Sequence, residues 1–114
     1  MLSPLGASLS GLRAGLEKLE ASANNVANLS TDGFKKDRVL LSEGVTGGVV
    51  VEIGKSTESG PSYRSPQGEV IEASNVDLAE EAVEQILAKY TFSMSLAAFK
   101  TTDEMQKGVI DLIA

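Results

Sequence analysis

Apolar residues recur along the first 26 positions at alternating intervals of four and three residues. The members of this stripe are Leu5, Leu9, Leu12, Leu16, Leu19, Ala23 and Val26. Such 3.5-residue spacing keeps one narrow stripe on the same side of a helix, which is typical of a helix that packs along a partner helix. We predict an N-terminal helix with Ser3 as its N-cap and Pro4 at its first position. Three glycines (Gly6, Gly11 and Gly15) each lower helix propensity by about 1 kcal/mol relative to alanine, so the isolated helix should be weak.

A second, longer apolar stripe ends the chain. Ser74 or Asn75 can cap its helix, and Asp77, Glu80 and Glu81 lie in the first turns, where the helix dipole favours anions. The stripe continues for about ten turns, which corresponds to a helix on the order of 50 Å long. Its members are Val83, Ile86, Leu87, Tyr90, Met94, Ala97, Met105, Val109 and Leu112.

Between the two helices the pattern changes to short β-branched runs. The runs 49-VVVEI-53 and 69-EVIEA-73 are bounded by glycine- and proline-containing turns. This is typical of strands separated by turns, so we predict a small hairpin or a pair of hairpins.

The predicted fold is mostly α with a small β section, in which long N- and C-terminal helices pair as an α-helical coiled coil joined by a short β-hairpin region. Residues 1–30 and 75–114 are expected to form a discontinuous terminal-helix domain, and residues 31–74 a signature loop with the small β section. Two antiparallel helices shield only part of each other's stripe, and chains of this size are marginal on buried area. We therefore expect other copies or other subunits to complete the burial.

Composition and charge remove several function classes. The chain has 114 residues, of which 42% are hydrophobic, which fits one ordinary domain. A net charge of -6 argues against nucleic-acid binding, which requires cations that neutralise phosphates. The absence of His and Cys removes the commonest general base and the usual nucleophile and metal-ligand sets. We predict no enzyme activity, no catalytic, cofactor-binding or metal-binding residues, and no insertion into a membrane, because no run is long enough to span one.

The N-terminal helix is expected to end at a group of asparagines, Asn24, Asn25 and Asn28. Asparagine tolerates the left-handed conformation, and its amide can satisfy the free carbonyls of a helix end. A turn at residues 31–33 places Gly33 where a positive φ is expected, and Phe34 then has an aromatic ring to bury. On residue chemistry alone, an ordinary capped helix followed by a loop explains this stretch equally well.

Two charge clusters flank these motifs. The basic cluster comprises Lys35, Lys36 and Arg38, and the acidic cluster comprises Asp77, Glu80, Glu81 and Glu84. They are either two solvated surfaces or groups that meet, within one subunit or between neighbours, and fix the register of the contact.

The stretch after Ser22 resembles the signature of the bacterial flagellar axial proteins, the rod and hook family, with the approximate pattern A-N-N-hydrophobic-A-N-x-x-T-x-G-F/Y-K. The matching residues are Ala23, Asn24, Asn25, Val26, Ala27, Asn28, Thr31, Gly33, Phe34 and Lys35. Near the other end, Asn75, Val76, Asp77, Leu78 and Glu81 are similar to the family's N-V-D/N-L-x-x-E pattern, and 100-KTTDEMQKGVIDL-112 to its K-x-x-D-E-M-x-x-x-hydrophobic-x-x-L pattern. The chain lacks the large inserted β domains of hook and distal-rod members, so it resembles either the compact, rod-like members or a reduced paralogue.

The resemblance implies a structural subunit of the basal-body rod that polymerises into a hollow helical tube, transmits torque and forms the export channel. The implied location is the flagellar basal body, where the rod crosses the periplasm, after passage through the flagellar type III export apparatus without a cleaved signal peptide. The implied partners are copies of this chain and other rod or hook axial proteins. The implied assembly residues are Asn24, Asn25, Asn28, Thr31, Gly33, Phe34, Lys35, Asn75, Val76 and Asp77. The alternative from another class is a soluble helical adaptor, such as an export-chaperone-like binding module.

Overall fold

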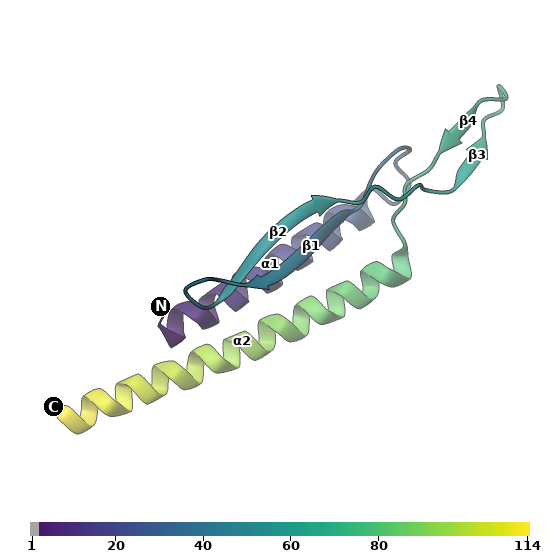
Figure 1. Ribbon diagram of the computed structural model, residues 1–114. Coiled ribbons are helices and arrows are strands. Elements are labelled where there is room, and N and C mark those ends of the chain that lie inside the picture. Colours follow the sequence, from purple (N-terminus) through teal and green to yellow (C-terminus); the bar gives the residue numbers. More distant parts are fainter. Residues whose placement is uncertain (1–2) are drawn as a thin grey trace.

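The computed structural model describes residues 3–114 and contains two long helices with two small antiparallel hairpins between them (Figure 1). The elements are α1 (Pro4–Ala27), β1 (Asp37–Glu43), β2 (Val49–Lys55), β3 (Ser62–Arg64), β4 (Val70–Glu72) and α2 (Leu78–Ile113). Strand β1 pairs with β2 and strand β3 pairs with β4. The predicted fold, mostly α with a small β section, is confirmed. Residues 1 and 2 of the predicted terminal-helix domain lie outside the described part of the chain.

The elements are arranged along one long axis. Helices α1 and α2 run antiparallel, α1 also contacts the β1–β2 hairpin, and the β3–β4 hairpin projects at the end opposite the C-terminus (Figure 1). The molecule measures 78 × 24 × 14 Å. Its radius of gyration is 19.8 Å, whereas a compact domain of this length has about 13 Å. The chain is therefore a rod-shaped helical pair with one hairpin along its side and one at its end.

Helix α1 begins as predicted but ends later. The Ser3 hydroxyl accepts a hydrogen bond from the Gly6 amide at 3.1 Å, and proline occupies the first turn. The helix runs past two of the asparagines to Ala27, and Asn28 is its C-cap with a φ of -104°. The expected left-handed asparagine is wrong, because the Asn28 amide instead satisfies the Asn24 carbonyl, at 2.9 Å, from an ordinary backbone conformation.

The N-cap of helix α2 lies three residues after Ser74 and two residues after Asn75, the two predicted caps. Asp77, rather than Ser74 or Asn75, is the N-cap, and its carboxylate accepts from the amides of Ala79 and Glu80. Asn75 does not cap the helix because its side chain makes contacts elsewhere in the fold: it accepts a hydrogen bond from the Lys36 amide, just before β1, and donates one to the Glu58 carbonyl. The predicted length is confirmed, since α2 comprises 36 residues without a break.

The pair of hairpins is confirmed, but only one strand of each was predicted. The predicted runs 49–53 and 69–73 fall on β2 and β4, whereas β1 and β3 were not predicted. Charged residues at both ends of β1, Asp37 and Glu43, flank its short apolar centre, so the sequence pattern there is weak. Strand β3 has only three residues, which is too short to form a pattern. The signal for β1 was the glycine-rich turn at residues 44–48, which connects two apolar runs.

Small residues, not the leucine stripe, make the contact between α1 and α2. The buried residues of α1 are Gly11, Ala14, Gly15, Ala21, Ser22 and Asn25. A Cβ atom on Gly15 would lie 3.1 Å from Phe92 Cβ and 3.2 Å from the Ala88 carbonyl oxygen. The two helix backbones therefore approach closely where side chains are absent or small. The leucine stripe is only partly covered in the single chain, where Leu9, Leu16 and Leu19 are 41%, 48% and 44% exposed.

The chain buries little apolar volume by itself. Among the described residues, the buried hydrophobic side chains are Ala14, Ala21, Val76 and Ala88. The accessible surface is 7755 Å², whereas a compact monomer of 11.9 kDa exposes roughly 5,950 Å². The second stripe is exposed as well: Val83, Ile86, Leu87, Tyr90, Met94, Met105, Val109 and Leu112 are all at least 47% exposed.

Gly15→Val is expected to lower the free energy of unfolding by about 1 to 3 kcal/mol, because a branched side chain must push α1 away from α2. Gly108→Ala is the matched control: a Cβ there meets no atom within 4 Å, so the change should stabilise α2 by about 0.4 to 1 kcal/mol. Urea unfolding followed by circular dichroism at 222 nm measures both. Equal midpoints for the two variants would contradict the close helix approach.

Candidate functional site: the joint between helices and hairpins

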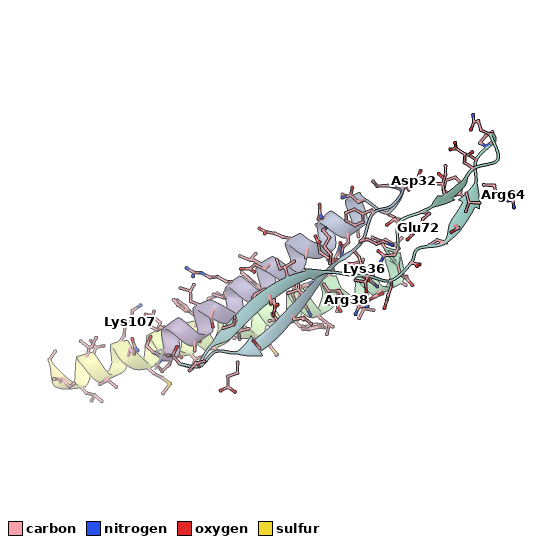
Figure 2. The ribbon with its side chains drawn as sticks, turned by 45° about the horizontal axis from the view of Figure 1, so that its top comes forward. Asp32, Lys36, Arg38, Arg64, Glu72 and Lys107 are labelled. Carbon is pink, nitrogen blue, oxygen red and sulfur yellow. The ribbon has the colours of Figure 1, made fainter. Side chains whose placement is uncertain are left out.

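The two sequence motifs meet at one place in the fold, where the end of α1, the segments around β1 and the start of α2 converge. Figure 2 shows Asp32, Lys36, Arg38 and Glu72 gathered in this region, with Lys107 far along α2. We call this region the joint and define it by Asn25, Lys36, Asp37, Glu58, Asn75, Glu80 and Glu81. Asp37 and Glu58 were not singled out from the sequence, because a single acidic residue in a polar stretch carries no signal.

Asn25 is the central side chain of the joint and is 1% exposed. Its amide nitrogen donates to the Asp37 carbonyl and to Glu81 Oε1, each at 3.0 Å, and its oxygen accepts from the Asp37 amide at 2.8 Å. One side chain therefore connects α1, β1 and α2. Because a buried polar group must keep its partners, these three bonds fix both the position and the orientation of the elements that they join.

The other two asparagines have different roles. Asn24 is exposed and donates to Asp37 Oδ2 at 3.1 Å, while Asn28 caps the helix and accepts from the Thr31 hydroxyl at 3.1 Å. Ser22, one turn before Val26, adds a buried bond from its hydroxyl to the Glu81 carbonyl at 3.2 Å. Of the three asparagines, Asn25 is thus a buried connector, Asn24 makes a surface contact and Asn28 caps the helix.

The basic and acidic clusters meet within the chain at Lys36. Its ammonium group, on a residue only 5% exposed, lies 2.8 Å from Glu80 Oε2 and 3.9 Å from Glu58 Oε2. Arg38 pairs with Glu58 at 2.9 Å. A buried ammonium group loses its hydration, so it is tolerated only while these carboxylates stay in place. The ion pairs therefore fix the register between β1 and α2.

The remaining acidic residues of that cluster have other partners. Glu84 pairs with Lys18 of α1 at 2.9 Å, and Glu81 is buried against Asn25. Lys35 pairs with Glu72 of β4 rather than with the acidic cluster. This contact, together with the Gly60 amide, lowers the pKa of the Glu72 carboxyl. Because the pKa is lowered in the folded state, the contact stabilises the fold at neutral pH and is lost as the pH falls through that lowered pKa.

The turn before β1 holds the second hairpin. Gly33 has a φ of +70°, as predicted, and its amide donates to the Glu72 carbonyl at 2.8 Å. Tyr63 of β3 donates its hydroxyl proton to Asp32 at 2.7 Å, and this hydrogen bond raises the pKa of the phenol. Phe34, whose ring was expected to be buried, is half-buried, and the Lys55 ammonium group lies 5.2 Å from its ring centroid.

The second motif enters the joint from the loop before α2. Asn75 Oδ1 accepts from the Lys36 amide at 2.7 Å, and Asn75 Nδ2 donates to the Glu58 carbonyl at 2.9 Å. Val76 is buried, and Asp77 caps α2. The structure therefore brings the two signature motifs together, whereas the residues of both predicted stripes lie along the helices outside the joint.

The joint borders a polar cavity of about 260 Å³ lined by Ser22, Asn25, Lys36, Asp37, Glu80, Glu81 and Glu84. Its charged side chains of both signs pair across it, which suits a structural contact. Within residues 3–114, no three Asp or Glu side chains lie close enough together to hold a metal ion.

Gly33→Val is expected to detach the β3–β4 hairpin, because a β-branched residue is strained at a φ of +70°. Gly33→Asn is the matched control, since asparagine tolerates this backbone region and no atom lies within 4 Å of the added Cβ. Limited proteolysis within residues 56–74 measures the effect. Cleavage several times faster for valine than for asparagine is expected, and equal rates would contradict the role of the turn.

Helices α1 and α2 pair, two hairpins lie between them in the sequence, and a polar joint forms where these elements meet, which defines an elongated protein built on paired helices. Residues 5–35 match the family described as "Flagella basal body rod protein", and residues 67–112 match "Flagellar basal body rod FlgEFG protein C-terminal". A search of curated proteins finds no significant match. The chain belongs to the flagellar rod and hook axial proteins, and its place is the flagellar basal body. Neither helix within residues 3–114 is long and apolar enough to cross a membrane.

Proposed function

We propose that this chain is a rod subunit that polymerises, with copies of itself and with other rod or hook axial proteins, into a hollow helical tube. The observation that carries the proposal is the exposure of large apolar side chains along both helices; Tyr90 and Met94, for example, are 63% and 67% exposed. Exposed apolar surface of this extent is larger than on a typical monomeric protein and marks a protein interaction site. The tube transmits torque and encloses the export channel.

The joint supports the torque-bearing part of the proposal. A subunit under torsion must keep its hairpins fixed relative to its helices, and Asn25 with the Lys36–Glu80 pair makes that connection through buried, directional bonds. In this proposal residues 1–30 and 75–114 form the inner helical domain and residues 31–74 the outer section. The signature residues, including Thr31 and Lys35, act as the connection between them.

The small buried core supports passage through the flagellar type III export apparatus. Four small buried hydrophobic residues among the described ones give the free chain little stability. Gly11 and Gly15 weaken the isolated α1 further. Such a chain is easily unfolded for export and gains its order when neighbours cover the stripes, which is coupled folding and binding.

Amide hydrogen exchange on the monomer and on the assembled protein tests the proposal. We expect residues 5–26 to exchange rapidly in a demonstrated monomer and to be protected at least a hundredfold more strongly in the polymer. A soluble adaptor or export-chaperone-like module would instead be a small, fixed oligomer with both helices protected in solution. Strong protection of residues 5–26 in a monomer that never polymerises would reject the rod-subunit proposal.

A further inference from the structure

The β3–β4 hairpin projects from the end of the molecule and receives no support from the other helices and strands (Figure 1). Within residues 3–114, neither β3 nor β4 packs against a helix or against the β1–β2 hairpin. The chain enters the hairpin through a connection at residues 56–61 and leaves it through a connection at residues 73–75. Contacts with loop segments alone therefore set the direction in which the hairpin points.

The hairpin and the adjoining parts of its two connections hold together as one unit, which we call the arm and define as residues 60–73. Strands β3 and β4 pair with each other, and the Ala73 amide extends this pairing by donating to the Pro61 carbonyl at 2.7 Å. A Cβ atom on Gly60 would collide with the Ala73 carbonyl oxygen, so the two connections touch because Gly60 has no side chain. These contacts lie inside the arm and do not depend on where it points.

The base of the arm is fastened to the joint. Asn75 Nδ2 donates to the Glu58 carbonyl at 2.9 Å, which ties the two connections together next to the arm. Asn75 Oδ1 accepts from the Lys36 amide at 2.7 Å, and the Glu58 carboxylate pairs with Arg38 at 2.9 Å. The base therefore stays in place when contacts of the arm itself break.

A second set of contacts, which we call the latch, holds the arm against the turn before β1. Tyr63 donates to Asp32 at 2.7 Å. The Gly33 amide donates to the Glu72 carbonyl at 2.8 Å, and Lys35 pairs with the Glu72 carboxylate. Tyr63 is 45% exposed, and the side chains of Lys35 and Glu72 are 30% and 40% exposed. Exposed contacts compete with water, so the latch is weaker than the buried contacts of the joint.

One residue separates the arm from its base on each connection, Ser59 on the first and Ser74 on the second. A cavity of about 440 Å³ lies beside them, lined by both connections and by residues 76–78 at the start of α2. A hinge needs only a few loop residues that absorb a change in φ and ψ. The two serines occupy such positions, and the cavity leaves the connections room to turn.

We propose that residues 60–73 are a hinged arm, which the latch to residues 32–35 holds in one direction and which turns as a unit about Ser59 and Ser74 when the latch opens. The joint keeps its geometry, because the base of the arm stays fastened. A molecule that binds the tip of the hairpin can therefore redirect the arm without opening the joint. The arm, the latch and the base belong to the single chain, so the inference does not depend on polymerisation.

Two conservative variants of the full chain weaken the latch. Glu72→Gln removes the charge that holds Lys35 and changes the size of the side chain very little. Tyr63→Phe removes the hydroxyl that donates to Asp32. Glu69→Gln is the matched control, because this exposed carboxylate of the arm forms no ion pair in the described part of the chain.

Amide hydrogen exchange, followed residue by residue by NMR, measures the latch and the arm separately. The Gly33 amide reports on the latch, and the Ala73 amide reports on the arm. Exchange at Gly33 requires the latch to open, so it should be about fivefold faster in each latch variant, as for the loss of about one hydrogen bond. Gly33 should keep its parent rate in Glu69→Gln, and Ala73 should keep its parent rate in all three variants.

Spin labels measure the direction of the arm, because the chain has no cysteine of its own. Labels are attached to Glu52→Cys on β2 and Gln67→Cys at the tip of the arm, both of which are exposed positions. The distribution of distances between the labels should be narrow in the parent and in Glu69→Gln. It should be broader in the double variant Tyr63→Phe/Glu72→Gln, which lacks two of the latch contacts.

Each other outcome overturns a specific part of the inference. Parent exchange rates at Gly33 in both latch variants would show that these contacts do not hold the arm. Faster exchange at Ala73 together with Gly33 would show that the hairpin unfolds instead of turning. Faster exchange at Gly33 with an unchanged distribution of label distances would rule out the hinge. None of these results bears on polymerisation, so the rod-subunit proposal stands or falls separately.

Discussion

Asn25→Asp is expected to lower the free energy of unfolding by about 3 to 5 kcal/mol, the cost of leaving a buried charge without compensation. Asparagine and aspartate have nearly the same shape, so the effect is electrostatic. The variant loses the two donated hydrogen bonds, to the Asp37 carbonyl and to Glu81 Oε1, and faces the buried Glu81 carboxylate with a second one. Urea unfolding at neutral pH, followed by circular dichroism, measures the loss.

Two further variants make the result specific. Asn28→Asp is the same chemical change at the C-cap of the same helix, where a negative charge costs only about 0.3 to 1 kcal/mol against the helix dipole. The double variant Asn25→Asp/Glu81→Gln exchanges donor and acceptor across the 3.0 Å contact and should recover part of the loss. Equal losses for Asn25→Asp and Asn28→Asp would show that Asn25 does not connect the elements.

Leu16→Asp is expected to abolish assembly while changing monomer stability by less than about 0.5 kcal/mol, as for other surface substitutions. The side chain is 48% exposed in the single chain, so an acidic group there remains hydrated. In the polymer the same group would be buried without a partner, which costs far more than the contact supplies.

The assembly experiment compares pelleted protein and negatively stained polymers for the parent chain, Leu16→Asp and the control Thr57→Asp. Thr57 is exposed in the loop after β2, so its variant adds the same charge away from both stripes. In cells that carry Leu16→Asp as their only copy, synthesis and export should continue and motility should be lost. Normal motility of such cells would refute the role of the leucine stripe.

Features that depend on neighbouring residues could be predicted from the sequence. The Ser3 cap with Pro4, the uninterrupted α2 and the positive φ of Gly33 each follow from contacts or steric limits within a few positions. Two of the four strands, β2 and β4, were predicted, because their own residues carry the strand pattern. Residues 49–55 carry their own β-branched pattern, whereas β1 is defined mainly by the partner strand with which it pairs.

The sequence alone determined that this chain forms two long helices with unsatisfied apolar stripes, because the period of a pattern fixes which residues share a helix face. Only the tertiary structure decided which face meets which partner. The leucines formed the clearer pattern, yet Gly11 and Gly15 contact α2, because their missing side chains let the backbones approach more closely than leucines could. Likewise Asn25 looked like one of three equivalent helix-ending residues. It became the buried connector because, among them, its side chain alone lies where α1, β1 and α2 converge, and its amide supplies both donors and the acceptor that this contact requires.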